Sequence, residues 1–391
     1  MKILFSLTYY TPYVSGLTLY VKRLAEALAK KSYQVSVISF QYRKDLKLEE
    51  EINKVRIIRI QPLFRISKGF FSLNWLLRNV REVKLSDIVV INLPQFEGIV
   101  PAILAKIFNK KLICIYHCEV VLPNGFLNKL AQTCLNWSNY LTLFFSDQVI
   151  TYTGDYAGHS KILPRFSDKT RYIYPPILAP KVDKRVQKVI RGKLGSDLKR
   201  VKGLTLIGIA ARLAAEKGIE YVLESIPILS SKFKVQSSKL REPGIKIVIA
   251  GPEDPVGEER YREKINHLVE KYKDYVVFIG ELKEEEMGSF YSLLDVLVLP
   301  SINSTEAFGM VQVEAMMMGI PVVATDLPGV RVPIQKTGMG RIVPIKNSEK
   351  LAEAIIEILR NKNKYIKDKE FIKKEFSLEK TIEFYKKLLS L

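Results

Sequence analysis

The sequence has no long uninterrupted run of apolar residues. A helix that spans a membrane needs ~20 mostly uncharged apolar residues, and the nearest candidate, residues 98–116, contains Lys106, Lys110 and Lys111. The first residues, MKILFSLTYYTPYVSG, also lack the apolar stretch and the small-residue cleavage site of a secretory signal peptide. We therefore expect a cytoplasmic protein that is either soluble or peripheral on the inner face of a membrane.

Cysteine is scarce, and acidic residues are outnumbered. Cys114, Cys118 and Cys134 follow the spacing of neither a disulfide framework nor a zinc site, so we expect reduced thiols. The 61 Lys and Arg exceed the 41 Asp and Glu and give a formal net charge of +20. Residues 1–180 hold 24 basic and 12 acidic residues, and residues 181–391 hold 37 and 29. Nucleic acid, anionic lipid and small anionic substrates all fit such a charge.

The 391 residues exceed one ordinary domain, and short apolar segments alternate with amphipathic ones. This alternation predicts a doubly wound α/β architecture with parallel strands. The predicted strands are residues 2–7, 34–40, 55–60, 87–93, 111–116, 148–153, 204–210, 245–251, 275–280, 295–301 and 320–325. The main predicted helices begin near residue 17 or cover 218–230, 257–273 and 283–293. A proline-rich linker at 171–185 predicts two domains, 1–180 and 181–376, and a terminal helix at 377–391 that packs back on the first domain.

Open parallel sheets bind ligands at the carboxyl ends of their strands, and three candidate groups stand there. Gly16 lies where the first loop becomes a helix, which suits a phosphate, although the turn alone could require glycine. Arg212 and Lys217 follow the strand at 204–210 and could neutralise a diphosphate, or form a solvated surface pair. His117 directly follows the strand at 111–116, as a ligand contact or as a buried structural group.

Two acids interrupt the apolar segment STEAFGMVQVEAMMMGIPVVAT at residues 304–325. Glu306 falls in a loop before a short predicted helix, where its charge would stabilise the helix N-terminus. Glu314 falls inside that helix among valine and methionine, where a carboxylate is costly without a partner. Stabilisation of the helix N-terminus does not account for a carboxylate inside the helix. Hydrogen bonds donated by the hydroxyl groups of a ligand would account for Glu314 better.

The segments TPYVSG, YHCE, ARLAAEKG, IAGPED, FIGELK and STEAFGMVQVEAMMMGIPVVAT, in this order, resemble glycosyltransferase family 4 over nearly the whole chain. The resemblance implies the GT-B fold, with two Rossmann-like domains facing a central cleft. It implies transfer of a hexose, with retention, from a UDP- or GDP-sugar. The expected acceptor is lipid-linked or a cell-envelope glycan, as in polysaccharide biosynthesis. Asp-x-Asp occurs nowhere in the sequence, so we expect neither a metal ion nor another cofactor.

The resemblance also implies roles for the candidate residues. Glu306 would contact hydroxyl groups of the donor sugar, and Glu314 would bind the ribose. Arg212 and Lys217 would hold the diphosphate and stabilise the departing nucleoside diphosphate. The remaining donor contacts would come from Gly16 against the phosphates, from His117 against the sugar, and from backbone amides around Phe308, Gly309 and Met310.

Two other functions stay open at this point. A sugar-nucleotide epimerase can have the same fold, and a basic nucleic-acid-binding protein would need its cations in one continuous stripe, without any recognisable binding motif here. Residues 63–84 combine aromatic and leucine side chains with five cations, which is typical of a helix on an anionic membrane surface. A helix packed on its own domain has the same composition. We expect nucleotide sugar, an acceptor and this membrane surface as partners, and no nucleic acid.

Overall fold

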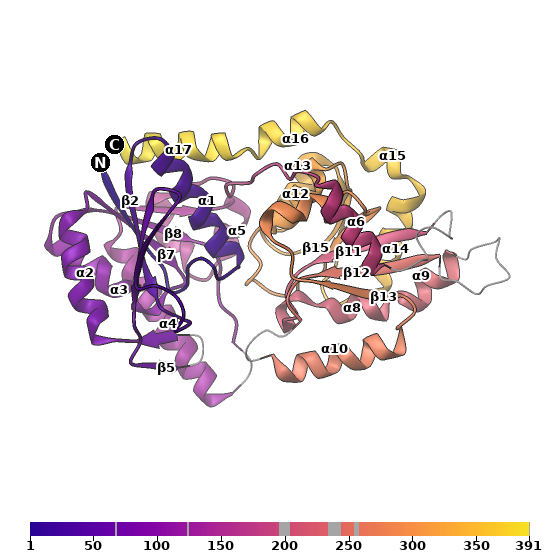
Figure 1. The fold of residues 1–391 in the computed structure, drawn as a ribbon, viewed down its shortest axis with the longest axis horizontal. Coiled ribbons are helices and arrows are strands. Elements are labelled where there is room, and N and C mark those ends of the chain that lie inside the picture. The colour runs from indigo at the N-terminus through magenta and orange to yellow at the C-terminus, as the bar shows by residue number, and fades with distance from the viewer. Residues whose placement is uncertain (67–68, 123–124, 195–203, 234–243, 254–257, 391) are drawn as a thin grey trace. The chain divides into compact units, whose positions relative to one another are not determined.

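The computed structural model describes residues 1–66, 69–122, 125–194, 204–233, 244–253 and 258–390 (Figure 1). The chain divides into two units, one formed by Met1–Pro176 with Leu378–Leu391 and the other by Ile177–Ser377. In each unit helices cover a mainly parallel sheet. The C-terminal helix therefore belongs to the first unit, and the chain passes between the units after residue 176, near the proline-rich segment.

The described part of the first unit contains an eight-stranded sheet with the order β10-β9-β8-β7-β1-β2-β4-β3. Its strands are β1 (Lys2–Ser6), β2 (Gln34–Phe40), β3 (Glu49–Ile52), β4 (Val55–Ile60), β7 (Ile88–Leu93), β8 (Lys111–Tyr116), β9 (Gln148–Thr151) and β10 (Thr170–Tyr172). Only the pairing of β3 with β4 is antiparallel. The central strands are almost entirely buried, as parallel strands between helical layers are.

The helices of the first unit lie on both faces of this sheet (Figure 1). They are α1 (Gly16–Lys30), α2 (Leu73–Leu85), α3 (Ile99–Ile107), α4 (Phe126–Phe145), α5 (Gly154–His159) and α17 (Leu378–Ser390), with short 3-10 turns η1 (Phe96–Gly98) and η2 (Leu163–Lys169). The chain crosses the sheet in one direction from β1 to β2 and in the other from β7 to β9. Because such crossovers are right-handed, α1 and the pair α3 and α4 cover opposite faces.

Helix α17 is fixed to the first unit by buried polar contacts. The hydroxyl groups of Tyr20 on α1 and Tyr385 on α17 lie 2.7 Å apart, and both rings are buried. The hydroxyl of Thr381 donates to the carbonyl of Tyr174 at 3.0 Å. These contacts join α17 to α1 and to the segment that follows β10.

The prediction of one helix over residues 63–84 is wrong in its first half. Residues 64–71 contain two short antiparallel strands, β5 (Phe64–Ile66) and β6 (Gly69–Phe71). Aromatic residues favour this arrangement because they pair across strands, and the rings of Phe64 and Phe71 stack at 5.0 Å. Helix α2 begins only at Leu73, and it packs on its own unit through Trp75 and Val83.

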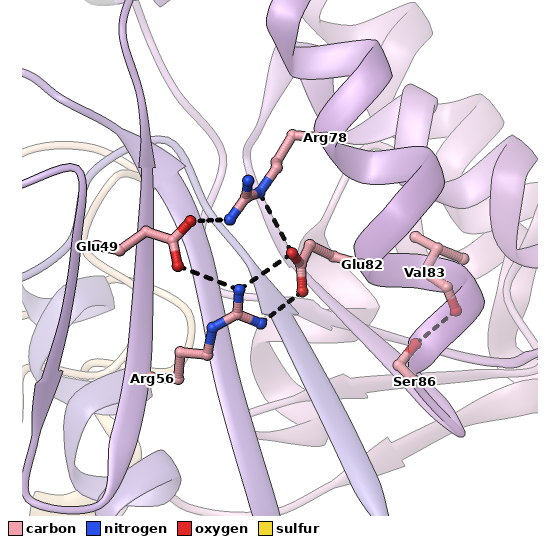
Figure 2. A network of polar contacts seen from close by, with 6 residues as sticks. All are labelled: Glu49, Arg56, Arg78, Glu82, Val83 and Ser86. Atoms are coloured by element: carbon pink, nitrogen blue, oxygen red, sulfur yellow. Dashed lines mark hydrogen bonds and ion pairs between the residues drawn. The ribbon is translucent and has the colours of Figure 1, made fainter.

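An ion-pair network also joins α2 to the sheet (Figure 2). The Glu82 carboxylate on α2 is buried and lies 2.9 Å from Arg56 Nη1 on β4. Arg78 on α2 contacts both Glu82 and Glu49 of β3. Burial acts to raise the pKa of Glu49, but Arg56 and Arg78 outweigh it and lower that pKa. The charged edge strand β3 is thus part of the attachment of α2.

The described part of the second unit contains a six-stranded, fully parallel sheet with the order β13-β12-β11-β14-β15-β16. Its strands are β11 (Thr205–Ala210), β12 (Ile245–Ala250), β13 (Val276–Gly280), β14 (Val296–Leu299), β15 (Val322–Thr325) and β16 (Gly340–Val343). Isoleucine, valine and leucine from these strands and from helices α8 (Ile219–Glu224) and α14 (Ser348–Arg360) form a buried core.

The helices of the second unit are short around the loops that follow β11 and β14. They are α6 (Lys184–Lys193), α8 (Ile219–Glu224), α9 (Ile226–Lys232), α10 (Glu259–Lys271), α11 (Met287–Tyr291), α12 (Met310–Met317), α13 (Val332–Thr337), α14 (Ser348–Arg360), α15 (Lys362–Tyr365) and α16 (Lys369–Glu375), with 3-10 turns η3 (Ala215–Lys217) and η4 (Glu284–Glu286). The single helix predicted at 218–230 is divided at Ser225, and Pro227 stands in the first turn of α9. Proline is compatible with that position because the first-turn amide needs no helical acceptor.

No helix within the described ranges is both long and apolar enough to cross a membrane.

Candidate active site

The strand order of the second unit reverses between β11 and β14. From β11 the chain continues to β12 and β13 on one side, and then returns to β14 on the other side. In open parallel sheets the loops that leave the strands at such a switch point diverge and leave room for a ligand. Lys217 follows β11 and Glu306 follows β14, so the fold brings both predicted residues to this edge.

Lys217 and Glu306 form an ion pair at the switch point. Lys217 Nζ donates to Glu306 Oε2 at 2.7 Å, and each side chain retains some exposure, 21% and 15%. The hydroxyl of Ser301 contacts the same carboxylate oxygen at 3.4 Å. The site thus places a cation and a carboxylate within reach of solvent, where a ligand with hydroxyl and phosphate groups can contact both.

Gly218 allows the loops that follow β11 and β14 to lie close together. Its backbone is left-handed, with φ +61°, and a Cβ there would lie 2.4 Å from the carbonyl oxygen of Pro300. Only glycine avoids both the strain and the clash. The neighbouring amide of Ile302 donates to the carbonyl of Glu216 at 3.0 Å, which joins the two loops by backbone as well.

Arg212 lies in the same loop and forms an ion pair with Glu216. Its side chain is 30% exposed. The loop is packed closely against the end of β12, because a Cβ on Gly251 would lie 2.1 Å from the carbonyl oxygen of Ala211. Both predicted cations therefore follow β11 and pair with carboxylates, Arg212 with Glu216 and Lys217 with Glu306. The sequence did not indicate Glu216 as a site residue.

Helix α12 begins directly after the loop that carries Glu306. Gly309 is its N-cap residue, has φ +76° and makes no side-chain capping bond. A Cβ at Gly309 would lie 2.4 Å from Leu299 Cδ2, so the helix start packs directly on β14. Phe308 is buried and Met310 is partly exposed. The positive end of the helix dipole consequently lies beside the carboxyl end of β14, where negative charge is favoured.

Glu314 lies on the same helix but is buried, with 6% of the residue exposed. The hydroxyl of Tyr291 on α11 donates to Glu314 Oε2 at 2.9 Å. The structure thus supplies the hydrogen-bond partner that the sequence alone did not show. The expected contact of Glu314 with a ribose stays a prediction.

His117 lies in the first unit at the end of β8 and is buried. Its Nδ1 is 2.5 Å from the hydroxyl of Tyr152, and its Nε2 is 3.0 Å from Asn92 Oδ1. Because Asn92 donates its amide to the carbonyl of Ser6, its oxygen accepts from Nε2–H, and Nδ1 accepts from Tyr152. Burial lowers the pKa of His117 to about 3, so the ring is neutral. Both ring nitrogens are therefore engaged in linking strand ends, and a sugar contact by His117 stays a prediction.

Gly16 is the exposed first residue of α1 in the first unit. Ser15 precedes it as the N-cap, and Ser15 Oγ accepts from the backbone amide of Thr18 at 3.2 Å. The loop before it is held by buried Arg59, whose Nη2 donates to the carbonyl of Thr11 at 2.9 Å. The position suits a phosphate contact, which likewise stays a prediction.

A buried acid in the first unit also escaped the sequence analysis. Glu97 lies in η1, after the end of β7, and accepts from the hydroxyl of Thr8 at 2.6 Å. Burial raises the pKa of its carboxyl. The signal in the sequence was a carboxylate soon after a strand that is apolar except for Asn92.

Among the described residues, no group of three or more His, Cys, Asp or Glu side chains could hold a metal ion.

Models of known protein families match both units of the chain. The model of Glycosyltransferase Family 4 matches residues 14–177, and the model of Glycosyl transferases group 1 matches residues 193–375. The chain belongs to glycosyltransferase family 4. An uncharacterized glycosyltransferase of Methanocaldococcus jannaschii is 27% identical over 370 residues, which cover 92% of this chain and 89% of that protein.

One further relative of this glycosyltransferase and one solved structure of similar fold are informative. The phosphatidyl-myo-inositol mannosyltransferase of Mycobacterium leprae is 30% identical over 159 residues, which are 41% of this chain and 38% of that protein. The crystal structure of Anabaena HepE in complex with UDP-glucose has a TM-score of 0.77 and 18% identity, and covers 100% of this chain and 99% of that one. The GT-B fold expected from the sequence is confirmed. Family membership favours a transferase over the epimerase and nucleic-acid-binding alternatives.

Proposed function

We propose that this glycosyltransferase moves a hexose, with retention, from a UDP- or GDP-sugar to a lipid-linked or cell-envelope glycan acceptor. The observation that carries the proposal is the ion pair of Lys217 and Glu306 at the switch point of the second sheet. A nucleotide sugar has the matching chemistry, since it joins an anionic diphosphate to a ring of hydroxyl groups. The named relatives support the choice of donor and acceptor, because HepE was crystallised with UDP-glucose and the mycobacterial relative is named for a phosphatidylinositol substrate.

The cations are the groups that would act on the diphosphate. Lys217 and Arg212 would neutralise its charge and stabilise the negative charge that grows on the leaving group. The start of α12 adds positive potential from backbone dipoles. Glu306 would accept hydrogen bonds from sugar hydroxyl groups, and Glu314 from the ribose. These charges belong to the chain itself, so the proposal includes neither a metal ion nor another cofactor.

Retention is proposed to follow a displacement on one face of the sugar. The acceptor hydroxyl oxygen bonds to the anomeric carbon as the bond from that carbon to the phosphate oxygen breaks. The acceptor proton passes to the departing diphosphate, which leaves with the charge that Lys217 and Arg212 stabilise. The configuration at the anomeric carbon is then the same in donor and product, which proton NMR of the product measures directly.

A donor panel tests the proposal. The thermal unfolding midpoint is measured with UDP, GDP and ADP and with their hexose conjugates. A rise with one nucleotide, and a larger rise with its sugar, supports the proposal. Lys217→Met should abolish the rise, while Lys273→Met, which removes an exposed ion pair with Glu270 on α10, should leave it intact. If no nucleotide or nucleotide sugar shifts the midpoint, the proposed donor class is wrong.

A further inference from the structure

Helix α4 exposes its apolar residues and buries polar ones. Its exposed apolar side chains, with the exposed fraction of each residue, are Phe126 84%, Leu127 76%, Trp137 62%, Phe144 59%, Leu130 55% and Leu141 37%. Three of its four buried residues are polar, namely Ser138, Asn139 and Thr142. A surface helix of a globular protein normally shows the opposite pattern.

Hydrogen bonds fix α4 in this orientation. The hydroxyl of Ser138 donates to the carbonyl of Phe96, and Asn139 Oδ1 accepts from the backbone amide of Gln95 at 3.3 Å. The hydroxyl of Thr142 is satisfied inside the helix, by the carbonyl of Ser138 at 2.8 Å. A rotation that buried the apolar face would break the bonds to Phe96 and Gln95 and leave a buried carbonyl and a buried amide without them. The exposed apolar face therefore follows from the fold itself.

The apolar face continues over the neighbouring helices. Helix α3 packs against α2 on one side and α4 on the other, and Figure 1 shows the three within the first unit. Further exposed apolar side chains on them are Leu73, Leu76, Leu77, Ile103 and Ile107. We call the outward side of α2, α3 and α4 the apolar face. Exposed apolar side chains that gather on helices packed against one another mark a binding surface.

The charges on helices α2, α3 and α4 are mainly positive. Helices α2, α3 and α4, which are described throughout, contain five cations and one acid, Glu82. That acid is buried and paired with Arg56. The exposed charges that remain on the three helices are Arg81, Lys84, Lys106 and Lys129. Just after α4, Asp147 is held by Lys106 and by the backbone amide of Leu112.

We propose that the apolar face binds the surface of an anionic phospholipid bilayer, with α4 as the principal contact. Leucine and phenylalanine side chains enter the boundary between headgroups and acyl chains, and the cations contact lipid phosphates. Trp137 suits the interface because an indole combines an apolar ring with a polar N–H. The surface differs from the one predicted at residues 63–84, since α4 contributes most of it.

A second copy of the chain is a poorer occupant of the same face. A symmetric dimer places the same patch opposite itself, so Arg81, Lys84 and Lys129 of the two copies would be brought together, while Lys106 is already paired with Asp147. Like charges across an interface disfavour association. An anionic bilayer meets the same cations with the opposite charge.

The two tryptophans provide a direct test. Trp75 is 3% exposed in the core of the first unit, whereas Trp137 is 62% exposed on α4. On addition of phosphatidylcholine vesicles containing phosphatidylglycerol, the full chain should sediment with the vesicles, and its emission should shift to shorter wavelength. Pure phosphatidylcholine vesicles and high salt should give much weaker binding. Trp137→Phe should remove the spectral shift but not the sedimentation.

A matched pair of variants locates the contact. Every residue from 126 to 137 is partly or fully exposed, so Phe126→Ser with Leu127→Ser should not disturb folding and should lower the partition coefficient by about tenfold or more. Val189→Ser with Ile366→Ser, at exposed apolar positions of the second unit, should leave it unchanged. Absence of sedimentation with anionic vesicles, or sedimentation unaffected by the first pair, would overturn the proposal. A concentration-dependent spectral shift and dimer mass without lipid would assign the face to a second copy.

The surface and the proposed chemistry can fail separately. The apolar face contains none of the residues proposed to bind the donor. The Phe126→Ser and Leu127→Ser variant should therefore keep the thermal shift caused by the nucleotide, and Lys217→Met should keep vesicle binding.

Discussion

Lys217 Nζ lies 2.7 Å from Glu306 Oε2, although 89 residues separate them in the sequence. Lys217 ends the turn after β11, and Glu306 lies in the loop after β14, the next strand in the sheet. The pair therefore depends on the reversal of strand order at the centre of the sheet. It joins a group suited to phosphate with a group suited to hydroxyls, and the first prediction concerns it.

Glu306→Gln should lower kcat/KM for the donor by on the order of 100-fold, because an amide accepts hydrogen bonds less strongly than a carboxylate and leaves Lys217 without its charge partner. The measurement is steady-state donor turnover, with the nucleotide thermal shift as a check of folding. Glu353→Gln, in an exposed pair with Lys350 on α14, is the control and should turn over donor normally. Wild-type turnover by Glu306→Gln would remove Glu306 from the site.

Gly218→Ala should lower the free energy of unfolding by about 3 kcal/mol, because the new Cβ combines a left-handed backbone with a clash against the Pro300 carbonyl. Nucleotide binding should weaken with it, since the clash separates the Lys217 and Glu306 loops. Gly280→Ala has a similar φ of +79° and no atom within 4 Å of the new Cβ. Its cost should be about 1 kcal/mol from the backbone alone, and urea unfolding compares the two. Equal costs would contradict the clash.

His117→Gln should remove part of the acid sensitivity of the fold. The pKa of His117 is lowered by burial to about 3, while the unfolded residue has the ordinary value. Between these values the unfolded chain binds the proton and the folded chain does not, so stability falls as the pH decreases. The slope from this one group is about 1.4 kcal/mol per pH unit. Glutamine can still accept from Tyr152 and donate to Asn92, and it does not titrate.

Urea unfolding of the wild type and of His117→Gln between pH 7 and pH 4 measures the difference, since carboxylates contribute equally to both. Equal slopes would show that His117 is not held neutral in the folded protein.

Local sequence pattern predicted those strands that are rich in β-branched and other apolar residues. The predicted ranges of β2, β4 and β8 match the observed strands, because such residues favour strands and most positions of these three are buried. Strand β3, with the sequence EEEI, was missed because its glutamates pair with arginines of its neighbours rather than with the core. The buried side of α4 was not predictable either. Its apolar residues face outward and three of its four buried residues are polar, so the sequence pattern points to the wrong side.

The candidate site was predictable in part. The motifs placed Lys217 and Glu306 at strand ends, and the structure brings the two together. The carboxylate partner of Arg212, the hydroxyl partner of Glu314 and the engagement of both His117 nitrogens were not predictable. Each depends on which loops and helices the tertiary fold brings side by side, and local pattern does not contain that information.

Arg56→Met should lower the free energy of unfolding by about 3 kcal/mol, because it leaves the buried Glu82 carboxylate with less compensating charge (Figure 2). Arg78 still contacts Glu82 from α2, so the helix itself should form, but its attachment to β4 should weaken. Arg43→Met breaks an exposed pair with Asp45 and should leave the unfolding midpoint unchanged. Replacing Arg56 and Glu82 together, by Met and Leu, should cost less than Arg56→Met alone, since no buried charge then remains unpaired. A double variant less stable than the single one would show that the network contributes more than mutual charge compensation.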